Sequence, residues 1–95
     1  MPHYVYILHC ADDSYYIGHS ANPYHRLNCH NLGSGAVYTR KRRPVALVYV
    51  ESCVSVVKAC RRERQLKRWS RAKKEALIRR DFGELKRLSR AKTKS

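Results

Sequence analysis

The pattern of apolar and polar positions predicts strands mainly in the first half of the chain and helices in the second. Residues 4–10 and 15–19 are rich in tyrosine, valine and isoleucine, and they predict two strands because such side chains suit a pleated sheet. The polar cluster at residues 11–14 predicts the turn of a hairpin between them. Residues 45–50 are almost all apolar and predict a third strand, at the centre of the sheet.

Tyr6 and Tyr16 lie on the two strands of the predicted hairpin. Because side chains alternate between the faces of a strand, these tyrosines share a face only if an odd number of residues connects the strands. We expect a connection of about three or five residues, as is common in hairpins.

A first helix is predicted between the second and third strands. Asn22 followed by Pro23 is typical of a helix start, and Gly33 is a typical end. Arg26 and His30 are four residues apart and therefore lie on one face of this helix.

The segment from Gly33 to Pro44 predicts a long loop, and loops of this length are often functional. A second helix follows the third strand and carries Glu63. Ser70 caps a third helix, and residues 81–84 have the spacing of a capping box that opens a last short helix, ending near Leu88.

This order of elements predicts an α+β fold with a three-stranded, mainly antiparallel sheet flanked by helices. The 95 residues are enough for one small core and too few for two. We therefore expect residues 1–88 to form a single domain and residues 89–95 to form a basic tail that frays.

The charge of the chain restricts its partners more than its fold. Lysine and arginine number 21 against 7 acidic residues, a formal net charge of +14, and 16 of the 21 lie at or after Lys58. Nucleic acid is the polyanion that a small basic protein most commonly meets, although an anionic membrane surface or an acidic protein would also attract it.

Other compositional features exclude some classes of protein. No apolar run approaches the roughly 18 residues of a membrane span, and the first residues do not resemble a signal peptide, so we expect a cytoplasmic location and no membrane partner. The four cysteines lack the spacing of a zinc site and are expected to be reduced apolar side chains.

Glu63 falls on the apolar face of its helix, four residues after Ala59 and three before Leu66. An unpaired carboxylate in the interior costs several kcal/mol, so Glu63 requires a partner. An arginine or a metal ion would serve.

Four predicted elements each supply a reactive side chain, and together these form a candidate set for cutting a phosphodiester bond: Tyr6, Tyr16, Arg26, His30 and Glu63. A divalent ion on Glu63 would polarise the phosphate, and Arg26 would hold a non-bridging oxygen. A tyrosine hydroxyl, or a water held by one, would supply or activate the nucleophile. His30 or His19 would accept or relay a proton.

Two short motifs resemble those of the GIY-YIG nuclease family. Tyr16-Ile17-Gly18 reads as the YIG element, and Tyr4-Val5-Tyr6 stands in the GIY position, with Tyr4 replacing the glycine. Arg26 stands where the family's helix carries its arginine, and Glu63 matches the family's metal-binding glutamate. The resemblance extends from about Tyr4 to Leu77.

Further residues resemble the small stand-alone bacterial branch of that family: Gly33 to Gly35, Tyr38-Thr39, Pro44 and Trp69 to Glu75. The chain as a whole also resembles the N-terminal domain of the excision-repair endonuclease. The resemblance implies a DNA endonuclease, with a role in DNA repair and one bound Mg²⁺ or Mn²⁺. His30 matches a histidine of restriction-type members. His19 stands where many members have lysine. Some members also place an asparagine in the helices after the glutamate, whereas this chain has no asparagine after Asn31.

We expect a further set of cationic side chains to contact the nucleic-acid backbone: His19, Arg40, Lys41, Arg42, Arg43 and Arg62. Such contacts add salt-dependent affinity and little sequence preference.

Two alternative functions stay open at this point. The chain could bind nucleic acid without cutting it, or it could be an adaptor whose basic helices dock on an acidic protein. DNA is the favoured partner and RNA an alternative, because both present the same phosphates, and a protein partner could supply selectivity.

Overall fold

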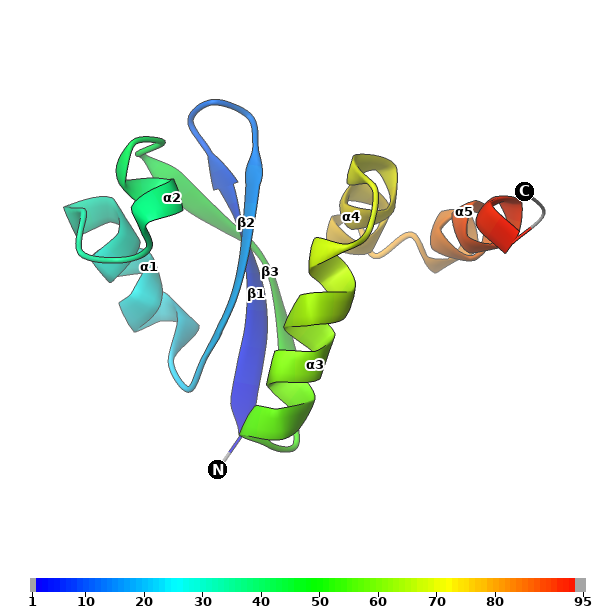
Figure 1. Ribbon diagram of the computed structural model, residues 1–95, viewed down its shortest axis with the longest axis horizontal. Helices are drawn as coiled ribbons and strands as arrows, with labels where there is room; N and C mark the ends of the chain where they lie inside the picture. Colours follow the sequence, from blue (N-terminus) through cyan, green and yellow to red (C-terminus); the bar gives the residue numbers. More distant parts are fainter. Residues whose placement is uncertain (1, 94–95) are drawn as a thin grey trace.

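The computed structural model describes residues 2–93, with side chains as far as Arg90, and shows an antiparallel sheet between two layers of helices (Figure 1). The strands are β1 (His3–Cys10), β2 (Tyr15–Ser20) and β3 (Val45–Cys53), in the order β2-β1-β3. The predicted three-stranded α+β fold is therefore confirmed.

β1, and not the predicted third strand, occupies the centre of the sheet. Four successive residues of β1, Val5 to Leu8, are buried, whereas β3 alternates between buried, half-buried and exposed positions. The apolar run in β3 reflects the helices that cover it. It does not mark a strand with a neighbour on both sides.

The connection between β1 and β2 has an odd number of residues, as predicted. The last pair between β1 and β2 joins His9 to Tyr15, which leaves five residues, 10–14, in the connection. Tyr6 and Tyr16 consequently pack in the same apolar cluster, on one face of the sheet.

Five helices complete the fold: α1 (Pro23–Leu32), α2 (Val37–Arg40), α3 (Val56–Lys67), α4 (Arg71–Ile78) and α5 (Phe82–Thr93). The Asn22 side chain caps α1 by accepting a hydrogen bond from the His25 N–H, and Ser70 caps α4 in the same manner. Both caps were predicted, because a cap depends only on neighbouring residues.

The structure differs from the prediction in one additional helix and in the end of the last helix. The short helix α2 lies within the segment that was expected to be a loop throughout. α5 continues to Thr93, beyond the expected end near Leu88, and residues 94 and 95 of the predicted tail lie outside the described part of the chain.

The alternation of side chains along β1 builds one apolar cluster on each face of the sheet. Val5 and Ile7 pack with Ala59 and Leu66 of α3 and with α4. Tyr6 and the next residues on its face pack with Leu27 of α1. α1 and α2 thus lie on one side of the sheet and α3 and α4 on the other (Figure 1).

The described residues hold four cysteines as free thiols. None of the helices within residues 2–93 combines the length and the apolar character needed to cross a lipid bilayer.

Leu66 anchors α3 to the sheet, and its replacement tests this packing. Leu66 is 0% exposed, so Leu66→Ala should lower the free energy of unfolding by roughly 3–5 kcal/mol through lost burial and the cavity left behind. Leu32→Ala is the matched control, because Leu32 is 79% exposed and its truncation should cost less than about 0.5 kcal/mol. Urea unfolding followed by circular dichroism measures both, and equal losses would contradict the assigned core.

Candidate active site

The five side chains expected to be catalytic come from β1 and β2 of the sheet and from the helices on its two sides. Tyr6 comes from β1 and Tyr16 from β2, Arg26 and His30 come from α1, and Glu63 comes from α3. The pKa of the Tyr6 hydroxyl responds to Tyr16, Arg26 and Glu63, so the set is close enough in space to interact. The structure therefore brings together residues that lie up to 57 positions apart in the sequence, from Tyr6 to Glu63.

Gly18 makes room for the Tyr6 ring. A Cβ atom at position 18 would lie 2.6 Å from the Tyr6 hydroxyl oxygen and 2.8 Å from the ring carbon that bears it. Real Cβ atoms do not approach so closely. The glycine of the Tyr-Ile-Gly motif is therefore needed for the position of the first motif's tyrosine.

Tyr6 and His30 form a buried hydrogen-bonded pair. The Tyr6 hydroxyl lies 3.0 Å from Nε2 of His30, and the two residues are 1% and 0% exposed. Nδ1 of His30 lies 2.7 Å from the hydroxyl of Thr39, which is 0% exposed. Thr39 in α2 therefore orients the imidazole, a role that sequence reasoning did not assign to it.

The hydrogen bonds around Thr39 indicate the tautomer of His30. The Thr39 hydroxyl donates to the carbonyl of Ala36 at 3.0 Å, so it accepts from Nδ1–H. Nε2 then accepts the proton of the Tyr6 hydroxyl. The backbone N–H of Ala36 also points at Nδ1, but its distance of 3.5 Å makes it a weaker contact than the 2.7 Å hydrogen bond to Thr39.

Burial sets the protonation of this pair. Burial raises the pKa of Tyr6 above its ordinary value, and the hydrogen bond from Arg26 opposes the rise. Burial lowers the pKa of His30, and the positive charge of Arg26 lowers it further. At neutral pH the pair consists of a protonated phenol and a neutral imidazole.

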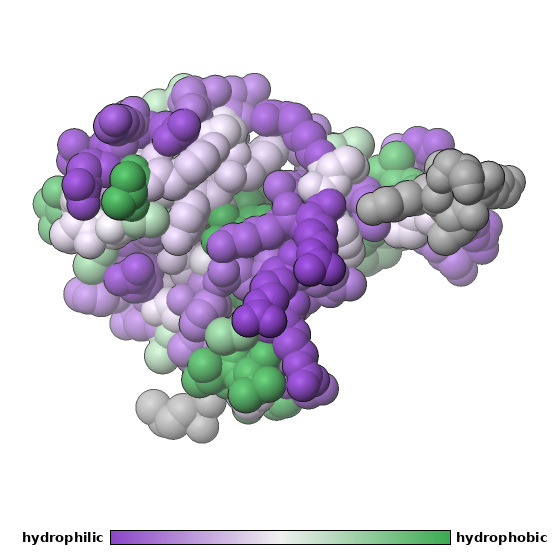
Figure 2. All heavy atoms as spheres, in the orientation of Figure 1, coloured by the Kyte–Doolittle hydropathy of each residue, from purple (hydrophilic) through white to green (hydrophobic). Residues whose placement is uncertain are grey.

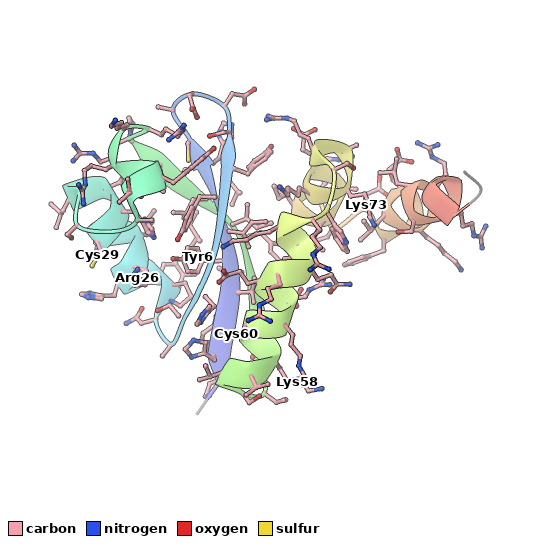
Figure 3. The ribbon with its side chains drawn as sticks, in the orientation of Figure 1. Tyr6, Arg26, Cys29, Lys58, Cys60 and Lys73 are labelled. Atoms are coloured by element: carbon pink, nitrogen blue, oxygen red, sulfur yellow. The ribbon has the colours of Figure 1, made fainter. Side chains whose placement is uncertain are left out.

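Arg26 is placed to hold an anion. It is half-buried beside Tyr6, and within the described part of the chain no carboxylate forms an ion pair with it (Figure 3). An arginine that is ordered but has no carboxylate partner retains its donors for a phosphate oxygen.

Glu63 is half-buried and reachable, with 18% of its side chain exposed. Among the described side chains its ion-pair partner is Lys67 and not an arginine, and the Lys67 ammonium lies 2.7 Å from the carboxylate one helical turn away. Apolar packing therefore does not seal the carboxylate from solvent.

His19 lies next to Glu63, and 31% of its side chain is exposed. Its Nε2 is 3.8 Å from the Glu63 carboxylate and 3.5 Å from the Cys60 sulfur, and its Nδ1 is 2.8 Å from a ring nitrogen of His3. Both ring nitrogens thus contact protein groups, and His19 belongs to the surroundings of the carboxylate.

A pocket of about 330 Å³ opens beside these residues. Tyr16, Tyr38 and Lys67 are among the side chains that line it, and the rings of Tyr16 and Tyr38 stack with centroids 6.0 Å apart. The guanidinium carbon of Arg42 also lies 3.9 Å from the centre of the Tyr38 ring, so Arg42 and Tyr16 already contact this ring, and the Lys67 ammonium is the group of the pocket that can bind a phosphate.

Four of the other five cations that were expected to contact nucleic acid have structural partners. Arg62 binds both carboxylate oxygens of Glu51, at 2.8 and 3.1 Å. Arg42 pairs with Asp12, and Arg40 and Arg43 donate to backbone carbonyls of the segment around α2. Lys41 is exposed at the end of α2. The structure thus gives Arg62 a structural partner and leaves Lys41 open to a ligand.

One residue of the site, Glu63, has a side chain that suits a hard divalent cation. Mg²⁺ commonly binds through one or two carboxylates and keeps several waters, taking the remaining oxygens from substrate phosphates. Glu63 supplies such a carboxylate. Within residues 2–93 no group of three or more histidine, cysteine or acidic side chains could hold an ion without the substrate.

Known proteins resemble this chain in sequence and in fold. The model of the GIY-YIG catalytic domain family matches residues 2–76. The chain is 49% identical to UPF0213 protein SH2523 of Staphylococcus haemolyticus over 76 residues, which cover 80% of this chain and 93% of the relative. It is 48% identical to UPF0213 protein VNG_2274C of Halobacterium salinarum, over 80% of this chain and 99% of that protein.

Two solution NMR structures resemble the fold. The UPF0213 protein BH0048 from Bacillus halodurans superposes with a TM-score of 0.53 at 45% identity, covering 82% of this chain and 83% of the other. The protein EF2693 from E. faecalis gives a TM-score of 0.59 at 38% identity, covering 86% and 88%.

The close approach of Tyr6 to Gly18 can be tested by adding one methyl group. Gly18→Ala should lower the free energy of unfolding by about 1–3 kcal/mol, because the new Cβ displaces the Tyr6 ring. Gly83→Ala in α5 is the control, since the nearest atom to its Cβ would be 3.8 Å away. Urea unfolding compares the two, and a Gly18→Ala protein as stable as the control would refute the steric argument.

The buried neutral His30 predicts how stability changes with pH. The pKa of His30 is lower in the folded protein than the ordinary value of about 6.5 that it regains on unfolding. The unfolded chain therefore binds more protons, and the free energy of unfolding should fall as pH decreases from about 7 to 5.

His30→Gln should show a smaller fall over the same pH range, whatever its stability at pH 7. Urea unfolding of both proteins at several pH values provides the comparison. The lower limit of about pH 5 keeps the measurement above the range in which carboxylates titrate. An equal fall in the two proteins would show that His30 is not the group responsible.

Proposed function

The chain belongs to the GIY-YIG family, and on this premise we propose that it is a metal-dependent endonuclease that hydrolyses phosphodiester bonds in DNA. The family suggests the nuclease activity; DNA as substrate, the metal and the cytoplasmic location are part of the proposal. One observation carries it above the others: the Tyr6 hydroxyl is hydrogen-bonded to His30 and lies within the electrostatic reach of Tyr16, Arg26 and Glu63.

Arg26 would bind the substrate phosphate. Its guanidinium lies beside Tyr6 and has no carboxylate partner among the described side chains. Hydrogen bonds from a guanidinium to a non-bridging oxygen hold the phosphorus in position and stabilise the charge that develops during the reaction.

Tyr16 and Tyr6 would have different tasks, because their exposures differ. Tyr16 is half-buried and can contact a water molecule next to the phosphate, whereas Tyr6 is enclosed with His30. The Tyr6 oxygen can accept a proton only as its own proton moves to Nε2 of His30. Since both pKa values disfavour the separated ions, this transfer would accompany the attack and would not precede it.

Glu63 would hold the divalent cation, Mg²⁺ or Mn²⁺, together with waters and a phosphate oxygen. The bound ion would polarise the phosphate and lower the pKa of a coordinated water. Lys67 would then lose its contact with the carboxylate, and its ammonium would be available to a phosphate at the neighbouring pocket.

The ion pair between Glu63 and Lys67 favours a second candidate function. A carboxylate that is already neutralised at 2.7 Å does not require a metal, as in a protein that keeps the fold and binds nucleic acid without cutting it. Under this alternative the affinity for DNA would not depend on divalent cations.

Glu63→Gln separates the two functions. If Glu63 holds the ion, the loss of several kcal/mol of transition-state stabilisation should reduce Mg²⁺-dependent nicking of plasmid DNA by about 100-fold or more. Glu84→Gln is the matched control, because Glu84 lies on α5 and pairs with Arg87 at 2.6 Å. Nicking at the wild-type rate by Glu63→Gln would defeat the assignment, and DNA binding without any nicking by wild type would favour the alternative.

A further inference from the structure

A second pocket lies outside the candidate active site, where the outer face of α3 meets the start of α4. Its volume is about 450 Å³, and we name it the α3–α4 pocket after the residues that line it: Arg61, Arg64, Gln65, Arg68, Trp69 and Lys73. Four of these six side chains are cationic and none is acidic. Figure 2 shows a hydrophilic surface over this part of the molecule.

Three arginines of this pocket have no partner for their charge. Within the described part of the chain, no hydrogen bond or ion pair engages the guanidinium of Arg61, Arg64 or Arg68. Arg62 on the same helix is different, because it binds Glu51 through two hydrogen bonds. α3 thus carries one arginine that stabilises the fold and three that are free to bind an anion.

Lys73 adds a cation whose aliphatic stem is largely buried and whose ammonium reaches the pocket. Only 8% of the residue is exposed, and its ammonium lies 4.4 Å from the centre of the Trp69 ring at the junction of α3 and α4 (Figure 3). The face of the ring attracts the ammonium but does not neutralise its charge. No carboxylate among the described side chains pairs with it, so an anion in the pocket would stabilise it further.

Trp69 itself has little free surface for a base. Lys73 lies over its ring at 4.4 Å and the guanidinium carbon of Arg62 at 5.3 Å. Two cations already occupy the ring, so stacking with a nucleobase is disfavoured. The chemistry of the α3–α4 pocket therefore suits a phosphate group and not a base.

We propose that the α3–α4 pocket binds a backbone phosphate of the nucleic acid, at a distance from the bond that is cut. The guanidinium fork matches two oxygens of a phosphate, and it also matches a carboxylate. The net charge of +14 and the proposed nuclease function favour nucleic acid as the source of the anion. The identity of the ligand as nucleic acid rests on the proposed function, whereas the pocket and its unpaired charge do not.

The position of the pocket relative to Glu63 follows from helix geometry. At 100° per residue, Arg61, Arg64 and Arg68 lie at least about 100° around α3 from Glu63. The width of a helix with its side chains is about 10–12 Å, which corresponds to roughly three nucleotides of one strand. A strand that passes over α3 can therefore reach both sites.

The test uses binding and not cleavage. A 20-nucleotide DNA is titrated into the protein in EDTA, and the fluorescence of Trp69 is followed, since this is the only tryptophan in the chain. The wild-type fluorescence should change on binding, and the logarithm of the affinity should fall linearly with the logarithm of the salt concentration.

The first variant replaces three arginines together: Arg61→Gln, Arg64→Gln and Arg68→Gln. It should bind the DNA at least about tenfold more weakly than wild type. The slope of log affinity against log salt concentration should become shallower by about 2–3, because each arginine contributes about one phosphate contact. The matched control replaces Lys58, Arg79 and Lys86 by Gln. It removes the same charge from exposed positions outside the pocket, and its slope should change by less than about 1. Equal losses in the two variants would overturn the proposal, because they would indicate general attraction and no site.

Lys73→Met is a second variant that keeps the aliphatic stem of the side chain. It should reduce affinity and the fluorescence response together, and an unchanged affinity and response would overturn the role of the ammonium. Circular dichroism confirms that each variant is folded. Poly-glutamate of matched charge should bind more weakly than DNA, and equal binding would instead assign the pocket to an acidic protein.

These outcomes are independent of the catalytic proposal. Active Glu63→Gln would remove the endonuclease assignment and leave the binding comparison interpretable. A triple variant with wild-type affinity and an inactive Glu63→Gln would remove the pocket proposal and retain the nuclease.

Discussion

The hydrogen bond between the Tyr6 hydroxyl and His30 joins the sheet to the helical layer on which the site is built. Tyr6 belongs to the central strand and His30 to α1, and both are enclosed by protein. Since a buried polar group without a partner costs about 1–3 kcal/mol, each side chain fixes the other. Gly18 leaves the space for the phenol, and Thr39 holds the far side of the imidazole. Arg26 is then positioned by the same helix that positions His30.

Acidic residues are scarce, and their positions decide which cations serve the fold. With 7 acids against 21 basic residues, most cations cannot be paired. Asp12 binds Arg42 and Glu51 binds Arg62, and each pair joins segments far apart in the sequence. Three of the arginines without such partners, Arg61, Arg64 and Arg68, lie together at the α3–α4 pocket. A fold built in this way separates structural arginines from those that remain available to a polyanion.

The sequence allows the local features of the fold to be predicted better than its long-range pairing. The caps at Asn22 and Ser70 depend on neighbouring residues and are where the pattern placed them. The order of the strands depends on distant contacts, and the apolar run of β3 wrongly suggested a central position. In the site, the motif spacing indicated Tyr6 and Glu63. The orienting role of Thr39 depends on how α2 folds back onto α1, which no local pattern encodes.

Lys67 shows how the cation and the nucleic acid would act on one another. It lies one turn after Glu63, a spacing visible in the sequence, yet only the structure shows that Lys67, and not an arginine, forms the ion pair with this carboxylate. The Lys67 side chain is 52% exposed, so the pair contributes at most about 1 kcal/mol and is no barrier to a divalent ion. A phosphate at the adjoining pocket attracts the ammonium away from the carboxylate. Binding of the strand and binding of the ion would therefore favour each other, because both release the same ion pair.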